Sequence, residues 1–256
     1  VLFFAACEGE ANSVEISTPE PSITAGVEQE VVQPGGQLRT YMPTLGQSLN
    51  PLLNDSKELA YLLTLCYEKL IDFDGNIALS PSLAENWSQE EEEQGGLQWI
   101  ISLRKNVKWH DGEPFTTKDV LYTFNLLRSP AYADSPYKQN VDRIAECIAL
   151  DEYTLSVTGK EPGVFVLYGM TFPVLPAHAF SAGGRPIGTG PYQLRFGDRE
   201  QGLLFEANET WWRSAPLVTQ IRVLPLLDND EALRNLNDNA LNFVLTDSVT
   251  ATGYRE

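Results

Sequence analysis

Apolar residues recur at helical spacing between residues 59 and 70. These positions are Leu59, Leu62, Leu63, Cys66, Tyr67 and Leu70. They fall at i, i+3, i+4, i+7, i+8 and i+11, so we expect the segment to form an amphipathic helix. Asp55, followed three residues later by Glu58, is the pair expected to cap the start of this helix.

Two further helices are expected later in the chain. One begins near Thr116, has Asp119 three residues on, and ends at Ser129-Pro130 because proline disfavours helical backbone in the residue before it. The other runs from about Asn229 to Leu236.

Six other segments are expected to form strands, and in two of them, 97–103 and 153–157, apolar and polar residues alternate as in half-buried strands. The segments are Leu38–Met42 (behind the turn at Pro34-Gly35-Gly36), 97–103, 153–157, Tyr192–Phe196, Leu203–Ala207 and Gln220–Leu224. The acidic run Glu90–Glu93 before Gly95-Gly96 is interpreted as a solvated hairpin loop. Strands and helices follow one another along the chain, which indicates an α/β protein with mixed sheets.

Composition narrows the class of partner. The chain has 256 residues, 43% of them apolar and 21% charged, as in ordinary globular proteins. Its 18 basic and 35 acidic residues give a formal net charge of −17. Such an excess of negative charge repels phosphate backbones, so no nucleic-acid partner is expected. Three cysteines and two histidines predict neither a disulfide scaffold nor a metal site, and no cofactor is expected.

The first residues have the pattern of an export signal. The apolar run Val1–Ala6 ends in small residues directly before Cys7, which resembles the lipobox of bacterial lipoproteins, where a cysteine carries the lipid. The following segment, as far as Gln33, is rich in Ser, Thr, Pro, Gly and Glu, as a solvated tether is. A short buried strand that contains Cys7 is the alternative. No other segment is apolar over the roughly 18 residues that a membrane span needs.

One continuous stretch carries a family resemblance. Residues 103–124 read LRKNVKWHDGEPFTTKDVLYTF, and this run resembles the signature of the family 5 extracellular solute-binding proteins, the peptide and nickel receptors of ABC importers. Further matches occur in the family's order, at Ser48–Pro51, Leu83–Trp87, Pro186–Tyr192 and Asn208–Trp212. The resemblance covers about Gln37 to Thr246.

The resemblance implies a particular architecture: a mixed-sheet lobe of the type II periplasmic-binding-protein kind with an inserted α+β subdomain. Family members are about twice as long, so the resemblance implies that a second lobe is missing from this sequence. The implied parts are a signal remnant with lipobox at 1–7, a flexible tether at 8–36, a discontinuous first lobe at 37–53 and 179–245, an inserted subdomain at 54–178, and the start of a crossover at 246–256. In particular, Leu38–Met42 is expected to pair with the region near Gln220–Leu224 or Asn242–Leu245.

The resemblance also implies ligand contacts. Asn54, Asp55, Ser56 and Lys57 match a loop that lends main-chain hydrogen bonds to an extended peptide in oligopeptide-binding members. Tyr137, in the sequence Ser135-Pro136-Tyr137, matches a tyrosine that lines the ligand cleft. The alternatives are that Asp55 and Ser56 only cap the next helix and that Tyr137 only packs on a loop.

Other conspicuous residues are interpreted as structural. The Gly188-Thr189-Gly190-Pro191 turn has no helix after it and therefore cannot form a phosphate loop. His110 is expected to be a solvated loop residue, and His178 is expected to be structural. Cys66 should be a buried free thiol, although a disulfide between Cys66 and Cys147 stays open.

The expected function is that of a non-enzymatic, monomeric receptor. It would be held at the outer face of the cell membrane by a lipid anchor, or be periplasmic, and deliver peptides or a similar small solute to ABC permease subunits. A sensory or adhesion lipoprotein with the same fold is one alternative. A carboxylate-based hydrolase is another, although no catalytic motif supports it. Nickel or haem also stays open as the ligand.

Overall fold

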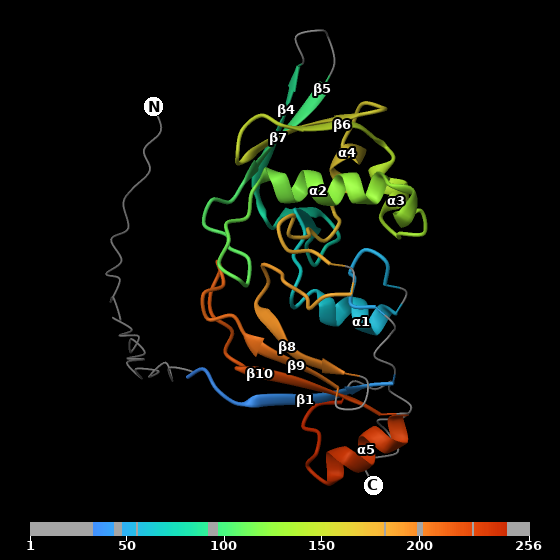
Figure 1. Cartoon of the computed structure of the whole chain (residues 1–256), viewed down its shortest axis with the longest axis vertical. Helices are drawn as coiled ribbons and strands as arrows, with labels where there is room; N and C mark the ends of the chain where they lie inside the picture. The colour runs from blue at the N-terminus through green and yellow to red at the C-terminus, as the bar shows by residue number, and fades with distance from the viewer. Residues whose placement is uncertain are drawn as a thin grey trace, which may run out of the picture. The chain divides into compact units, whose positions relative to one another are not determined.

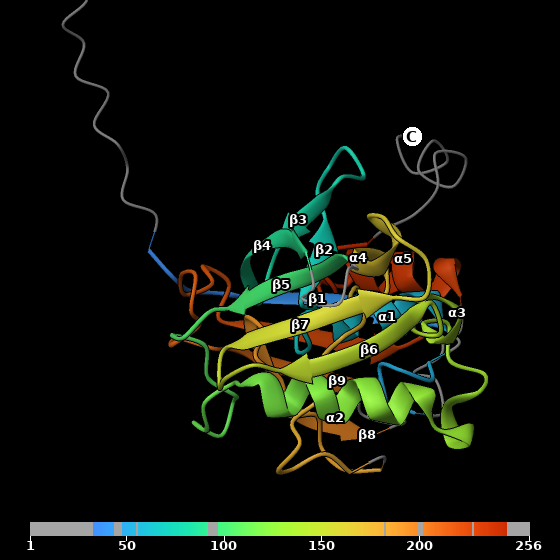
Figure 2. The ribbon, with the colours of Figure 1, turned by 90° about the horizontal axis from the view of Figure 1, so that it is seen from above.

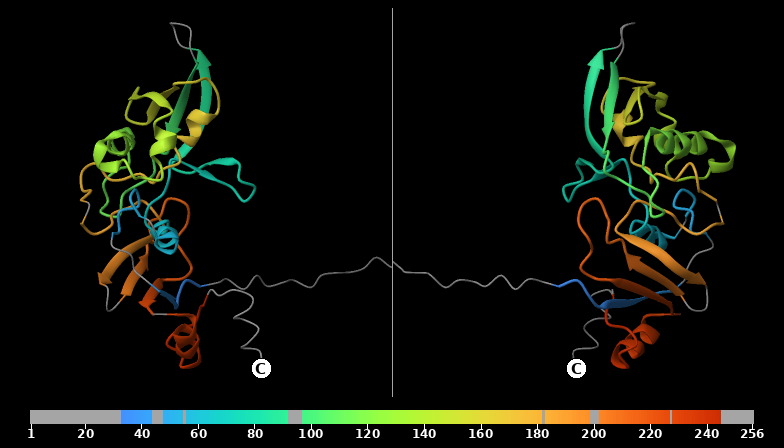
Figure 3. Two further views of the ribbon diagram at one scale, coloured as in Figure 1. Left: turned by 90° about the vertical axis from the view of Figure 1, so that its right-hand side faces the viewer. Right: turned by 60° about the vertical axis from the view of Figure 1, so that its left-hand side comes forward.

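In a computed structural model, the structure describes residues 33–43, 48–54, 56–91, 97–181, 183–198, 202–226 and 228–244. These described residues belong to one compact unit. Their strands form two four-stranded sheets and one two-stranded sheet. Figures 1 and 3 show the two larger sheets at opposite ends of this unit, with helix α1 between them. Cys7, Asp55 and the predicted crossover at 246–256 lie outside the described residues.

The first sheet joins segments from the two ends of the described chain. Its strands are β1 (Gln37–Met42), β10 (Gln220–Pro225), β9 (Gly202–Ala207) and β8 (Tyr192–Asp198), in that order. β1 pairs in parallel with β10, with Leu38 opposite Ile221, and the other pairs are antiparallel. The predicted pairing of Leu38–Met42 with Gln220–Leu224 is therefore confirmed. Helix α5 (Asn229–Asn237) follows β10.

The second sheet is wholly antiparallel and lies between α1 and β8 in the sequence. Its strands are β4 (Ala84–Glu91), β5 (Leu97–Leu103), β7 (Thr154–Gly159) and β6 (Ile144–Ala149), in that order. Figure 2 shows α2 (Thr117–Arg128) running along the β6 side of the sheet. The remaining elements are β2 (Ile71–Phe73), β3 (Leu79–Pro81), η1 (Pro130–Tyr132), α3 (Lys138–Val141) and α4 (Phe165–Tyr168).

Helix α1 is shorter than its apolar pattern predicts. It spans Lys57–Leu63, and its N-cap is Ser56, whose Oγ accepts a hydrogen bond from the Leu59 N–H at 3.2 Å. The prediction of a helix as far as Leu70 and of Asp55 as its cap was wrong. The apolar positions beyond α1 are buried all the same. The chain leaves the helix there because the carbonyl groups of residues 65 and 66 accept hydrogen bonds from the segment that leads into β8.

Helix α2 begins as predicted. Thr116 and Asp119 form a capping box, and the carboxylate Oδ2 of Asp119 accepts a hydrogen bond from the Thr116 N–H at 2.9 Å. The same Oδ2 is 3.3 Å from the indole nitrogen of Trp109, while Oδ1 accepts from the Ala177 N–H at 2.9 Å. One buried carboxylate thus ties the start of the helix to the nearby loop at Trp109 and to the distant segment at Ala177.

The first two residues of the acidic run belong to a strand and not to a loop. Glu90 and Glu91 belong to β4, where they pair with Gln98 and Leu97, so their assignment to a loop was wrong. Most of β4 is exposed, which explains why the strand carries no apolar signal.

Cys66 is buried and Cys147 half-buried, and both are free thiols, so the disulfide alternative is excluded. Burial raises the pKa of each thiol to about 12.

Candidate functional site

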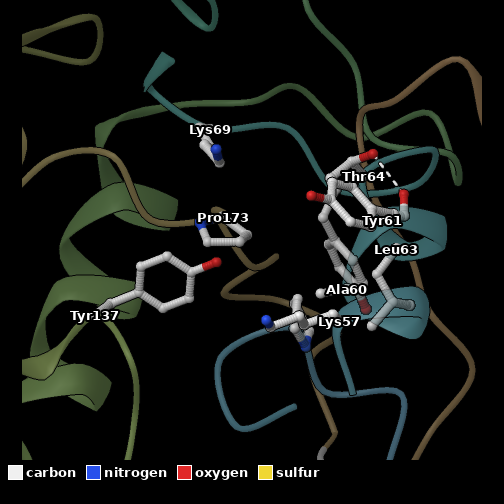
Figure 4. A pocket seen from close by; sticks show the side chains of 10 residues that line it. Lys57, Ala60, Tyr61, Leu63, Thr64, Lys69, Tyr137 and Pro173 are labelled. Atoms are coloured by element: carbon white, nitrogen blue, oxygen red, sulfur yellow. Dashed lines mark hydrogen bonds between the residues drawn. The ribbon is translucent and has the colours of Figure 1, made fainter. Parts of the chain in front are cut away.

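A cavity of about 360 Å³ opens between α1 and Tyr137. Its volume lies at the lower end of the range of small-ligand sites. Figure 4 shows Tyr137 on one side of this cavity, Lys57, Ala60 and Tyr61 of α1 on the other, and Lys69 and Pro173 nearby. The lining residues are Pro51, Lys57, Ala60, Tyr61, Leu63, Thr64, Tyr67, Lys69, Tyr137 and Pro173. We call this cavity the α1 pocket.

The exposed face of α1 forms one wall of the α1 pocket. Leu59 and Leu63 are buried in the core, whereas Lys57, Ala60 and Tyr61 are exposed and line the pocket. Tyr61 is 77% exposed, an unusual position for an aromatic ring in the absence of a partner. This wall therefore offers an apolar ring and an ammonium group side by side.

Tyr137 forms the other wall. Its backbone N–H donates to Ser135 Oγ at 3.3 Å, and the ring packs against the hydrophobic core. Burial, and then the negative charge of Asp72, raise the pKa of the Tyr137 phenol. The hydroxyl group thus stays protonated at neutral pH and can act as a hydrogen-bond donor or acceptor. Figure 4 shows it directed toward the middle of the pocket.

The residues expected to contact ligand divide between the pocket and its surroundings. Lys57 and Tyr137, which are 80 positions apart, both line the α1 pocket. Asn54 and Ser56 are not among its lining residues, and Asp55 lies outside the described part of the chain. The Ser56 N–H, which a main-chain contact with ligand could use, donates to Asn54 Oδ1 at 2.8 Å. That bond would have to break before this N–H could bind a peptide.

No motif identified Lys69, Pro173 or Tyr61 as pocket residues. Lys69 and Pro173 meet in an isolated antiparallel bridge outside the named strands. Such a bridge joins segments that are distant in sequence, so neither periodicity nor a motif predicts it. Tyr61 falls outside the apolar stripe of its helix, and this mismatch was the one available sign of an exposed role.

Two larger hollows exist among the described residues. One of about 700 Å³ is bounded by Gln193, Glu206 and the loop from Asn208 to Pro216. Another, of about 570 Å³, lies over β1 and β10 and is mainly apolar. The α1 pocket is the better candidate because ammonium and hydroxyl groups from separate segments converge with apolar surface in it, as in small-molecule sites.

His110 is not the solvated loop residue that the sequence suggested. Its Nδ1 accepts a hydrogen bond from the Gly188 N–H at 3.1 Å, and its Nε2 lies 3.0 Å from the Gly190 carbonyl oxygen. Burial lowers the pKa of the imidazole to about 4. The Nε2 of His178, in contrast, lies 2.8 Å from Asp111 Oδ2 in a hydrogen-bond contact. Within the described ranges, no group of His, Cys, Asp and Glu side chains could hold a metal ion.

Glu68, the most buried glutamate of the described ranges, contacts a tryptophan side chain. Glu68 Oε2 accepts a hydrogen bond from the Trp212 indole N–H at 2.9 Å, and burial raises the pKa of the Glu68 carboxyl. The guanidinium groups of Arg104 and Arg213 each lie 4.6 Å from the centre of the Trp212 ring. Glu68 is not among the lining residues of the α1 pocket, so this carboxyl group is not placed to act on a ligand there.

Known proteins with similar sequences and folds identify the family. The model of "Bacterial extracellular solute-binding proteins, family 5 Middle" matches residues 78–253, more than half of the chain. YhjP of Bacillus subtilis strain 168, itself uncharacterised, is 29% identical over 184 residues, which are 70% of this chain and 30% of YhjP. The periplasmic oligopeptide-binding protein OppA of Escherichia coli K12 is 28% identical over an alignment of 210 positions that covers 70% of this chain and 37% of OppA.

The fold is also that of a solved receptor. The oligopeptide-binding protein AppA of Bacillus subtilis, solved with a nonapeptide, superimposes with a TM-score of 0.75 at 21% identity, over 86% of this chain and 46% of AppA. The chain therefore spans about a third of the length of its curated relatives and under half of AppA. The predicted fold class, a partial lobe with mixed sheets, is confirmed. No described helix is long and apolar enough to cross a membrane. The chain belongs to the family 5 bacterial extracellular solute-binding proteins.

Proposed function

We propose that the chain is part of a non-enzymatic extracytoplasmic receptor that captures peptides or a similar small solute and delivers it to an ABC permease. The observation that carries the proposal is the α1 pocket, because it brings Lys57 and Tyr137 together. OppA and AppA, whose names describe oligopeptide binding, support a peptide as the ligand. We further propose the division into a first lobe (37–53 and 179–245) and an inserted subdomain (54–178), with Asn54, Asp55 and Ser56 at the ligand's edge.

The affinity of this chain for peptide should be low. Two-lobed receptors gain most of their affinity by burying ligand between lobes. The α1 pocket is lined by residues of a chain that spans 46% of AppA, so it offers a smaller contact surface. We expect dissociation constants near or above about 1 mM, a binding free energy of about −4 kcal/mol. Nuclear magnetic resonance titration of the 256-residue chain measures binding in this range.

Tyr137→Ala should weaken peptide binding by about 1–2 kcal/mol, about five- to thirtyfold in dissociation constant. The substitution removes both the aromatic surface and the hydroxyl group that face the pocket. Amide chemical-shift changes of the labelled chain, followed while a blocked tripeptide is added, report the affinity. Tyr153→Ala is the matched control, because Tyr153 does not line the α1 pocket. An affinity that is unchanged in Tyr137→Ala would place the ligand on another surface.

Lipid anchoring through Cys7 has a separate test. In a precursor that carries the complete export signal, Cys7→Ser should release the protein from membranes, because the thiol that would receive the lipid is missing. Metabolic labelling with a fatty acid should label the wild-type protein alone. Cys147→Ser, which also removes one free thiol, should stay labelled. Equal labelling of the Cys7→Ser variant would refute the anchor.

A further inference from the structure

The walls of the α1 pocket carry positive charge alone. Two of the chain's seven lysines, Lys57 and Lys69, line the pocket. None of the described lining residues is acidic, although acidic residues outnumber basic ones by 35 to 18 in the chain. The pocket is thus a local exception in a protein whose overall field repels anions. Resting on the proposed function, we infer that the α1 pocket selects solutes that place a carboxylate group between Lys57 and Lys69.

Lys57 is available to a ligand. It is exposed at the first position of α1, and within the described ranges its ammonium group has no hydrogen bond or ion pair. The neighbouring carboxylate, Glu58, accepts a hydrogen bond from Ser56 Oγ at 3.1 Å and lines the separate hollow over β1 and β10. The charges of Lys57 and Glu58 interact, but of the two side chains Lys57 alone lines the α1 pocket.

The ammonium group of Lys69 forms a salt bridge with Asp72. Its Nζ lies 2.7 Å from Asp72 Oδ1, and the Asp72 side chain is 48% exposed. The Lys69 side chain is 23% exposed, so the pair is partly open to solvent. Solvent screens such a pair, which lowers the cost of exchanging Asp72 for a ligand carboxylate. The Asp72 charge also reaches Tyr137, whose phenol pKa it helps to raise. Asp72 therefore opposes anion binding at the pocket, whereas Lys57 favours it.

Because Lys57 favours anion binding and Asp72 opposes it, substitutions at the two positions should change the preference for carboxylate in opposite directions. A general disturbance of the structure would not do so. The 256-residue chain is titrated with N-acetylated tripeptides that differ in a single group. One pair, Ala-Glu-Ala amide and Ala-Gln-Ala amide, compares a side-chain carboxylate with its neutral analogue. A third peptide, Ala-Gln-Ala with a free C-terminus, compares a terminal carboxylate. Amide chemical shifts of the pocket residues give each dissociation constant, and the spectrum of each free variant shows that it is folded.

We expect at least one carboxylate peptide to bind about fivefold more tightly than the neutral peptide, because exposed charge pairs contribute about 0.2–1 kcal/mol each and two ammonium groups act together. Lys57→Gln should abolish this preference, and Lys57→Arg should retain it. Asp72→Asn should enlarge it, since the variant keeps an oxygen acceptor but removes the opposing charge. Lys160→Gln, the control at an exposed lysine outside the pocket, should leave it unchanged.

The contrary outcomes are distinguishable. Equal affinity for the neutral and both carboxylate peptides would overturn the inference and leave the proposed peptide site in place. A preference that survives in Lys57→Gln would overturn the assignment of the carboxylate to this pocket. If no peptide shifts the pocket resonances even at tens of millimolar, about tenfold above the expected dissociation constant, both the inference and the proposed site fall.

Discussion

Replacing Gly188 by alanine should lower the free energy of unfolding by about 3 kcal/mol, the upper end of the usual cost of overpacking. A Cβ atom on Gly188 would lie 1.8 Å from the carbonyl oxygen of Cys66 and 2.5 Å from its carbonyl carbon. Both atoms belong to the backbone, so no side-chain rotation relieves the clash. The Gly188 N–H donates to His110 Nδ1, and the Gly188 carbonyl accepts from the His110 N–H at 2.8 Å. The loop therefore cannot retreat without losing these two bonds.

Urea unfolding of Gly188→Ala beside Gly75→Ala measures the effect. A Cβ atom on Gly75 would meet no atom within 4 Å, so this control should change stability by no more than about 0.5 kcal/mol. If the two variants lose the same small amount, Gly188 does not approach Cys66 as closely as described, and the junction between α1 and β8 is looser. A variant too unstable to purify, with Gly75→Ala intact, agrees with the expected clash.

The turn at Gly188 illustrates which predictions the sequence can support. Its structural role followed from chain order alone, because a strand rather than a helix comes next, and the close approach to Cys66 agrees with this interpretation. Strands β5, β7 and β10 and helix α2 were predictable from local sequence. In each of them, the apolar residues that recur at the spacing of a strand or helix face the core. Local pattern and tertiary burial coincide in these elements.

The predictions failed where backbone groups bond to distant segments. Helix α1 ends early because the carbonyl groups of Leu65 and Cys66 accept hydrogen bonds from the N–H groups of Tyr192 and Gly190, each at 2.9 Å. Nothing within residues 59–70 carries information on a partner more than 100 positions away. Strand β4 was not predicted because most of its residues are exposed, and an exposed strand needs no alternation of apolar and polar residues.

The candidate site was predictable in part. Tyr137 and Lys57 came from a resemblance in motifs, whereas Lys69 and Pro173 enter the α1 pocket through a bridge that is visible in three dimensions alone. The charge of the pocket was equally hidden, because an overall excess of acidic residues says nothing of which side chains share one wall. Composition argued against a nucleic-acid partner but could not predict a pocket lined by two lysines.

Acidification below pH 6.5 should destabilise the chain through His110, by about 3 kcal/mol on reaching pH 4. In the folded chain, Nδ1 accepts the Gly188 N–H and Nε2 faces the Gly190 carbonyl oxygen. The neutral ring with its proton on Nε2 satisfies both groups. Protonation adds a hydrogen to Nδ1, where it meets the N–H of Gly188, and also places a charge on a largely desolvated ring. Arg185 and Arg195 add to this effect, while the negative charge of Asp111 opposes it.

The direction of the pH dependence follows from the two pKa values. The unfolded chain takes up the proton near the ordinary histidine value of 6.5, whereas the folded chain takes it up near pH 4. Between these values the unfolded state binds more protons, so stability falls by about 1.4 kcal/mol for each pH unit of acidification. Above pH 6.5 the ring is neutral in both states, and this contribution is fully present.

The pH dependence of stability is compared between variants and the wild type. This comparison separates the contribution of His110 from those of the carboxyl groups, which also titrate on acidification. His110→Asn retains an acceptor for the Gly188 N–H without an ionisable ring, so its stability should fall less steeply than that of the wild type between pH 6.5 and 4. His178→Gln removes the other histidine of the chain and should keep the His110 contribution. Imidazole resonances provide the direct measurement, since the His110 ring should not titrate until about pH 4. A His110 midpoint near 6.5 would mean that the ring is solvated after all and does not hold Gly188 and Gly190 in place.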